Sequence, residues 1–241
     1  MSEPKVAILI PSTSHGRDNW KTWKDSYLYT VTIRSFLQTY DKDLYKYRFF
    51  IGIDKGDRIY DTQICRDELS RFLSVMKNVE IEFMYMNDVN KGHLTVMWNK
   101  LYDKSLNDNY DYFVQCGDDI EFKTKGWMKD AITSLQSTND IGAVGPLNNN
   151  PRILTQTIVS RKHKELFGYY FPPEILNWFC DDWINEVYKE LKYFYPMKNH
   201  FCINMGGKPR YTVNGGDSNM KVRQLCTELV KRDVERARLI I

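Results

Sequence analysis

The sequence lacks the features of a secreted, cross-linked protein. Its five cysteines are an odd number, they are widely spaced, and none belongs to a Cys-x-x-Cys pair. Thiols of this kind are typical of a reducing compartment and indicate neither a disulfide framework nor a zinc knuckle. Asn-x-Ser/Thr glycosylation sites are also absent, which agrees with a chain that stays outside the secretory pathway.

Long hydrophobic runs and a concentrated basic charge are missing too. The first apolar run extends only from Val6 to Ile10 before Pro11, which is too short for a signal peptide or a transmembrane segment. The 34 basic and 31 acidic residues give a formal net charge of +3, so we expect no nucleic-acid partner. We expect a soluble cytoplasmic protein. Its frequent Lys, Asn, Tyr and Ile residues are typical of an AT-rich microbial or viral genome.

The sequence does have the hydrophobic content of a folded α/β domain. Hydrophobic residues make up 42% of its 241 residues, which is enough for a sizeable core. Strands are predicted by the apolar runs at residues 5–10, 48–53 and 79–86. Helical patterns accompany them at residues 23–40, 61–76 and from residue 94 onward. This order predicts a mostly parallel central sheet flanked by helices, with the strand at residues 79–86 nearer an edge.

The second part of the chain is less regular. Helical patterns cover residues 126–135 and 217–238, and residues 141–146 predict a short strand. Many aromatic side chains and a Pro-Pro pair occur in residues 152–180, which we expect to be irregular. A further helix opens near Cys180, with Asp181 or Asp182 as its cap. No linker separates the two parts, so we predict a single domain over residues 1–241.

The fourth predicted strand ends in two adjacent carboxylates. Residues 112–114 form an apolar run, and Gly117, Asp118 and Asp119 follow soon after it. Adjacent carboxylates hinder each other's ionisation unless a cation or water lies between them. Ligands of α/β sheets bind beyond the carboxyl ends of the strands, so the pair is placed to hold a divalent cation and, through it, phosphate oxygens. The alternative is an Asp-rich turn that only closes the strand.

Four segments, in order, resemble the glycosyltransferases with a GT-A fold and are similar to family 2. They are the first strand with Pro11-Ser12-Thr13, the acidic loop at Asp54, the Cys116-Gly117-Asp118-Asp119 turn, and the Asp181-Asp182 pair. The resemblance covers roughly residues 5–190. It implies a Rossmann-like nucleotide-binding domain, in which residues 1–122 bind the nucleotide sugar and residues 123–241 serve the acceptor.

The resemblance implies a donor site at the carboxyl edge of the sheet. The residues implied for the nucleotide are Pro11, Ser12, Thr13, Arg17, Asp54, Lys91, Asn99 and Asp118. Within this set, residues 11–13 line the nucleoside pocket, Arg17 reaches the diphosphate, and Asp54 reads the base or the ribose. Uridine is the family's commonest base, so a UDP sugar is the expected donor.

A divalent metal ion, Mn²⁺ or Mg²⁺, is also implied, because the leaving nucleoside diphosphate develops negative charge that must be stabilised. The implied ligands are Asp118, Asp119 and His200. Cys116 occupies the first position of the family's Asp-x-Asp pattern, and a thiol does not replace a carboxylate toward a hard cation. For His200 the alternative is a hydrogen-bonded surface residue.

Asp181 and Asp182 match the family's Glu-Asp motif, which implies Asp182 as the general base and Asp181 as its neighbour. The implied reaction moves a hexose from a nucleoside-diphosphate sugar to a hydroxyl of a glycan, protein or small-molecule acceptor. One alternative is a non-catalytic nucleotide-sugar-binding module, which Cys116 keeps open. A sugar nucleotidyltransferase is disfavoured, because the first loop has a single glycine, Gly16, to hold a triphosphate.

Overall fold

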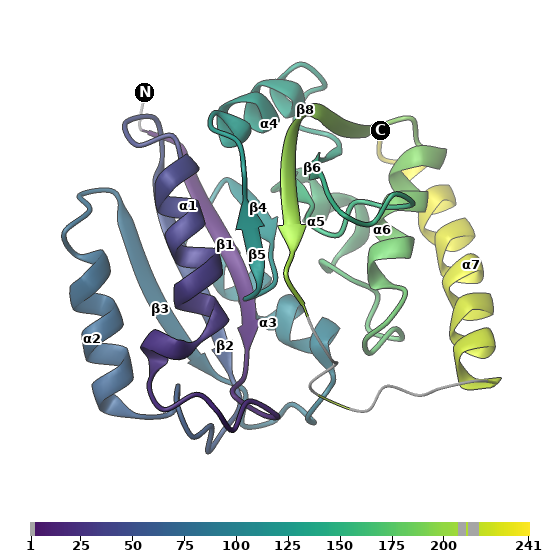
Figure 1. Cartoon of the computed structure of the whole chain (residues 1–241). Helices are drawn as coiled ribbons and strands as arrows, with labels where there is room; N and C mark the ends of the chain where they lie inside the picture. Colours follow the sequence, from purple (N-terminus) through teal and green to yellow (C-terminus); the bar gives the residue numbers. More distant parts are fainter. Residues whose placement is uncertain (1–2, 207–210, 212–216) are drawn as a thin grey trace.

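The computed structural model describes residues 3–206, 211 and 217–241. One eight-stranded sheet forms its centre (Figure 1). Its strand order is β3-β2-β1-β4-β7-β6-β8-β5. Four neighbouring strands are parallel: β1 (Lys5–Ser12), β2 (Lys46–Ile53), β3 (Val79–Tyr85) and β4 (Tyr112–Gln115). The predicted α/β sheet is confirmed, and β3 is an edge strand as predicted.

The other strands of the sheet run in mixed directions. They are β5 (Ile120–Phe122), β6 (Ala143–Leu147), β7 (Ile158–Ser160) and β8 (Phe194–Asn204). β7 is antiparallel to both β4 and β6, whereas β8 pairs parallel with β6 and antiparallel with β5. The sequence predicted only β6 of these four. The expectation that residues 152–180 are irregular is wrong in part, because they contain β7 and α5 (Lys162–Phe167).

Helices cover both faces of the sheet, as Figure 1 shows. Successive residues of a strand point to opposite faces, so Ile8 packs into one hydrophobic core and Leu9 into the other. The first core is closed by residues 23–39, α2 (Gln63–Leu73) and α4 (Trp127–Gln136). The second is closed by α3 (Leu94–Asn107), α5, α6 (Cys180–Glu190) and α7 (Asp217–Arg238). Across the described part of the chain, no helix has both the length and the apolar character of a membrane span.

The helix predicted at residues 23–40 is divided into three pieces. They are a 3₁₀ turn, η1 (Trp23–Asp25), a π-helical stretch, η2 (Leu28–Ile33), and α1 (Arg34–Thr39). Two hydroxyl groups of this segment accept hydrogen bonds from backbone N–H groups of β5. Thr32 Oγ1 accepts from the Ile120 N–H at 2.9 Å, and Ser35 Oγ accepts from the Phe122 N–H at 3.0 Å. The segment therefore fixes the chain that follows β4.

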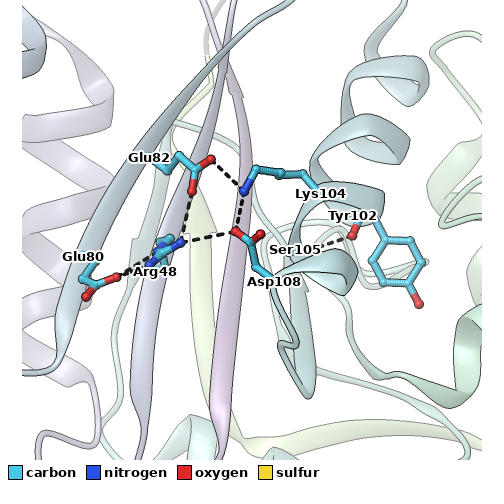
Figure 2. Close-up of polar contacts among 7 residues, drawn as sticks. All are labelled: Arg48, Glu80, Glu82, Tyr102, Lys104, Ser105 and Asp108. Atoms are coloured by element: carbon cyan, nitrogen blue, oxygen red, sulfur yellow. Dashed lines mark hydrogen bonds and ion pairs between the residues drawn. The ribbon is translucent and has the colours of Figure 1, made fainter.

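A network of charged side chains joins β2, β3 and α3 on the amino-terminal side of the sheet (Figure 2). The Arg48 guanidinium contacts Glu80, Glu82 and Asp108, and Lys104 contacts Glu82 and Asp108. The network holds the carboxyl end of α3 against β2 and β3, although the chain continues from this end of α3 to β4.

Candidate active site

A cleft of about 570 Å³ opens at the carboxyl ends of β1, β2 and β4. Most of the residues implied by the resemblance line it: Pro11, Ser12, Thr13, Arg17, Asp54, Asp118, Asp119, Asp181 and Asp182. They come from four separate segments of the chain. The parallel strands bring the first three segments together, because their ends meet at one edge of the sheet. The fourth segment is the start of α6.

The two carboxylates that follow β4 lie in a tight turn, residues 117–120, which we call the acid turn. Asp118 is buried, and its Oδ2 accepts from Ser12 Oγ at 2.6 Å. A Cβ atom at residue 117 would lie 2.7 Å from Asp119 Oδ1, so Gly117 lets that carboxylate fold back over the turn. The Met205 N–H donates to the Asp119 carbonyl at 2.9 Å. The acid turn is therefore held by β1, by residues 28–35 and by the end of β8.

Asp57 is a buried hub between the loops that follow β1 and β2. Its carboxylate accepts from the Ser14 N–H at 2.6 Å, from the Ser14 hydroxyl at 2.9 Å and from the Thr13 hydroxyl at 3.1 Å. It also accepts from the N–H groups of Ile59 and Tyr60. Hydrogen bonds to a charged group are roughly twice as strong as neutral ones. Sequence reasoning missed this role, although Asp57 lies in the acidic loop that drew attention to Asp54.

Tyr211 is the second functional candidate that sequence reasoning missed. Its hydroxyl donates to the Asp54 carboxylate and lies 3.3 Å from Thr13 Oγ1. Its ring stacks on His15 with the ring centroids 4.9 Å apart. Burial, followed by the contact with Asp54, raises the pKa of Tyr211, so the hydroxyl remains a donor. Tyr211 and Asp54 are 157 residues apart in the sequence, and no local pattern links them.

The acid pair, Asp181 and Asp182, lies in the first turn of α6. The helix begins at Cys180, and its N-cap is Phe179, which makes no side-chain capping bond. The prediction that Asp181 or Asp182 caps this helix is therefore wrong. Both aspartates instead lie in the first turn of the helix, where the positive end of the helix dipole favours negative charge. Phe179 has φ 74°, a left-handed conformation that is unfavourable for a bulky side chain.

The two acids have different surroundings. Asp181 Oδ1 accepts from Gln115 Nε2 at 2.7 Å, and desolvation raises the pKa of Asp181 to about 7. The Asp182 side chain is 27% exposed and lies 3.8 Å from an Arg152 nitrogen. Trp178 lines the same end of the cleft and is 46% exposed. This end therefore combines two carboxylates, a guanidinium group and a half-exposed indole side chain.

His200 lies away from the cleft lining. Its Nε2 is 2.8 Å from Asp130 Oδ2, and its Nδ1 is 3.0 Å from Thr124 Oγ1. Both ring nitrogens are thus engaged outside the acid turn. The hydrogen bonds match the alternative that the sequence left open, but His200 is buried and not a surface residue.

Lys91 and Asn99 also lie outside the cleft lining. Lys91 is exposed on the surface. The Asn99 side chain donates to the Phe171 carbonyl at 2.8 Å and accepts from the N–H groups of Tyr170 and Phe171. Asn99 therefore anchors the aromatic segment after α5 to α3.

Cys116, at the first position of the family's acidic pattern, is fully buried and does not line the cleft. Burial raises the pKa of its thiol, and its Sγ lies 3.2 Å from the Gly117 carbonyl. The thiol is therefore protonated at neutral pH and is no ligand for a hard cation.

The acid turn fits a divalent cation that shares its coordination with a ligand. In the described ranges, no three His, Cys, Asp or Glu side chains form a closed metal site. Mg²⁺, however, is usually held by one or two carboxylates together with substrate phosphates and water. Asp118 and Asp119 line the cleft together and supply the oxygen ligands that such ions prefer.

Solved structures provide the comparison that decides the fold. No protein-family model matches the sequence, and no curated protein matches it. The structure of S. aureus TarS 1-349 in complex with UDP-GlcNAc is 11% identical with a TM-score of 0.60, over 92% of this chain and 65% of that one. The complex with UDP is 11% identical with a TM-score of 0.53, over 83% and 60%. TarS is a family 2 glycosyltransferase with a GT-A fold.

The chain has a GT-A fold. The fold that the sequence resemblance implied is thereby confirmed. A GT-A fold at 11% identity does not define a reaction. The chain spans 60–65% of the TarS 1-349 chains and 36% of a longer TarS chain.

Proposed function

We propose that the chain is a metal-dependent glycosyltransferase that moves a hexose from a nucleoside-diphosphate sugar, preferably a UDP sugar, to an acceptor hydroxyl. The observation that carries the proposal is one cleft that contains two separate sets of carboxylates. Asp54 and the acid turn lie at the sheet edge, and Asp181 and Asp182 lie at the start of α6. The likeness to TarS, which was solved with UDP and with UDP-GlcNAc, supports the same class of donor.

The donor occupies the sheet edge in this proposal. Residues 11–13 face the nucleoside, Asp54 binds the base or the ribose, and Arg17 meets the diphosphate. Asp118 and Asp119 would hold Mn²⁺ or Mg²⁺. When bound, this ion supplies positive charge that stabilises the leaving diphosphate.

The acceptor occupies the α6 end. Its hydroxyl oxygen attacks the anomeric carbon, and the bond from that carbon to the diphosphate oxygen breaks with its electron pair. Asp182 takes the hydroxyl proton, which requires a carboxylate within hydrogen-bond distance. The exposed face of Trp178 suits a sugar ring of a glycan acceptor, because aromatic faces bury the apolar side of such rings.

Turnover of UDP-GlcNAc with Mn²⁺, measured as UDP release, tests the proposal. We expect Asp118→Ala and Asp182→Asn each to lower kcat at least about 100-fold, since each removes a group that acts on charge or on the proton in the transition state. Asp103→Asn is the matched control, because Asp103 is an exposed aspartate of α3 that pairs with Lys164. Full activity of Asp182→Asn would contradict the assignment of the base.

A second candidate function is a non-catalytic nucleotide-sugar-binding module. The buried Cys116 thiol in place of a carboxylate favours it. Binding of UDP without release from any UDP sugar, with or without acceptors, would support this module over the transferase.

A further inference from the structure

A buried glutamine links the strand before the acid turn to the helix of the acid pair. Gln115 is the last residue of β4, is 1% exposed and lines the cleft. Its Nε2 donates to Asp181 Oδ1 at 2.7 Å. Within the described residues, the only other side-chain donor to this carboxyl is the Cys180 thiol, 3.8 Å away. The amide is therefore the main side-chain contact of the Asp181 carboxyl.

Thr157, the residue just before β7, contacts the Gln115 side chain and backbone. The Thr157 hydroxyl donates to Gln115 Oε1 at 2.9 Å, and the Gln115 N–H donates to the Thr157 carbonyl at 2.9 Å. The Tyr170 hydroxyl donates to the same carbonyl at 3.1 Å. With the Thr157 hydroxyl donating to the amide oxygen, the NH₂ group of Gln115 faces Asp181.

The groups around Asp181 make its ionisation unfavourable without this donor. Those that face it are Cys180 and Asp182 from α6, Gln115 from β4 and Tyr170 from the segment after α5. Desolvation raises the pKa of Asp181, the Gln115 amide lowers it, and the charge of Asp182 raises it again. Arg152 contacts Asp182, not Asp181. The amide is thus the strongest of the contacts that favour a negative charge here.

We infer that Gln115 is a positioning residue for the transfer reaction: its amide holds the Asp181 carboxyl in the cleft and favours the ionised form of that carboxyl. In the proposed transfer, the ionised Asp181 then lies beside Asp182, the carboxylate that takes the hydroxyl proton. This catalytic consequence rests on the proposed function. The contact between Gln115 and Asp181 does not depend on the proposed function.

Melting temperatures of the full chain from pH 5 to pH 9 test the contact without any substrate. The difference between wild type and Asp181→Asn follows the titration of Asp181. The same difference is measured in a Gln115→Leu background, which lacks the donor. We expect the midpoint to rise by about one to two pH units, the size of a lost hydrogen bond to a charged group. An unchanged midpoint would overturn the inference.

Two further variants keep the test decisive if Gln115→Leu does not fold. Gln115→Glu keeps the size of the side chain but places a carboxyl opposite Asp181, and it should also raise the midpoint. Ser105→Ala is the control, because it removes another buried hydrogen bond, from Ser105 Oγ to the Tyr102 carbonyl at 2.8 Å (Figure 2), and Ser105 does not line the cleft. It should leave the midpoint in place, and a shift as large as that of Gln115→Glu would overturn the inference.

The pH profile of UDP-GlcNAc turnover tests the catalytic consequence. Gln115→Leu should move the acidic limb of kcat upward by the same interval and recover kcat at high pH. A role in folding alone would lower kcat equally at every pH, and that outcome refutes the positioning role. A wild type that neither binds UDP nor releases it from a donor refutes the proposed function, whereas the melting midpoints still decide the Gln115–Asp181 contact.

Discussion

His163 shows how burial sets the protonation of a single side chain. Its Nε2 lies 3.0 Å from the Tyr170 carbonyl and its Nδ1 lies 2.8 Å from the Tyr188 hydroxyl. A carbonyl only accepts, so Nε2 carries the proton and Nδ1 accepts from Tyr188. Desolvation lowers the pKa of His163 to about 4. A second proton, on Nδ1, would require the Tyr188 hydroxyl to accept instead of donate.

We therefore predict that His163 makes the fold acid-sensitive. Between pH 6.5 and pH 4 the unfolded chain binds a proton at this residue and the fold does not, so the free energy of unfolding falls as the pH decreases through this window. Relative to His163→Gln, wild type should lose about 2 kcal/mol between pH 7 and pH 5. Urea denaturation at the two pH values measures the difference. The exposed His15→Gln is the control, and a parallel loss in His163→Gln would contradict the prediction.

The residues that sequence reasoning missed are those whose partners come from other segments. Asp57 gathers N–H and hydroxyl groups of two loops, and Tyr211 reaches Asp54 from near the end of the chain. A tyrosine or an aspartate in a polar loop carries no local pattern that reveals such contacts. Asp54 and Asp118 were accessible to prediction, because Asp54 directly follows an apolar run and Asp118 comes soon after one.

At the scale of elements, residues 28–35 act as a brace for the acid turn. Thr32 Oγ1 accepts from the Ile120 N–H and lies 3.3 Å from the Gly117 carbonyl, so one hydroxyl closes both ends of the turn. The sequence predicted a helix here, but it could not predict the π-helical stretch. The π-helical stretch makes contacts with β5, which is more than 80 residues away in the sequence, and no local pattern indicates such contacts.

We expect Thr32→Val to destabilise the fold by about 1–3 kcal/mol, because it leaves the buried Ile120 N–H without an acceptor. It should also weaken Mn²⁺ binding in the presence of UDP, since the turn that bears Asp118 loses its brace. Urea denaturation and calorimetric titration measure the two effects. Thr30→Val, on the exposed side of the same segment, should change neither by more than about 0.5 kcal/mol. Equal stability of Thr32→Val and Thr30→Val would disprove the brace.

At the scale of the whole molecule, a single sheet runs through the parts predicted for donor and acceptor. β8 pairs with β6 and β5 and leads to the acid turn, while α6 packs against β8 and α7 packs against α6 and α5. β1, β2 and β4 could be predicted because each is an apolar run that is largely buried on both faces. β3 could be predicted because its alternating pattern is typical of a strand near an edge. β8 could not, because most of its side chains are exposed or half-buried. β5 has only three residues, too few for a periodic signal.

Ligand binding in this cleft should stabilise the whole chain. UDP at 100 times its Kd, with Mn²⁺, is expected to add about 2.7 kcal/mol to the free energy of unfolding. For a chain of this size that corresponds to a rise in Tm of about 5–10 °C. Differential scanning calorimetry with UDP, ADP and GDP, each with Mn²⁺ or with EDTA, measures the base preference and the metal dependence. An equal rise with EDTA would argue against the cation at the acid turn.

The left-handed backbone at Phe179 affects when, during folding, Asp181 and Asp182 become oriented. A non-glycine residue in this conformation is less favourable by about 1–2 kcal/mol, so a free peptide of this segment would rarely adopt it. In the fold, the Phe179 carbonyl receives the Trp183 N–H, and the Cys226 thiol of α7 lies 3.6 Å from it. A fragment that ends before α7 would keep both aspartates but lose the partner that steadies their starting point. Asp181 and Asp182 therefore reach their final orientation only after α7 has packed against Phe179.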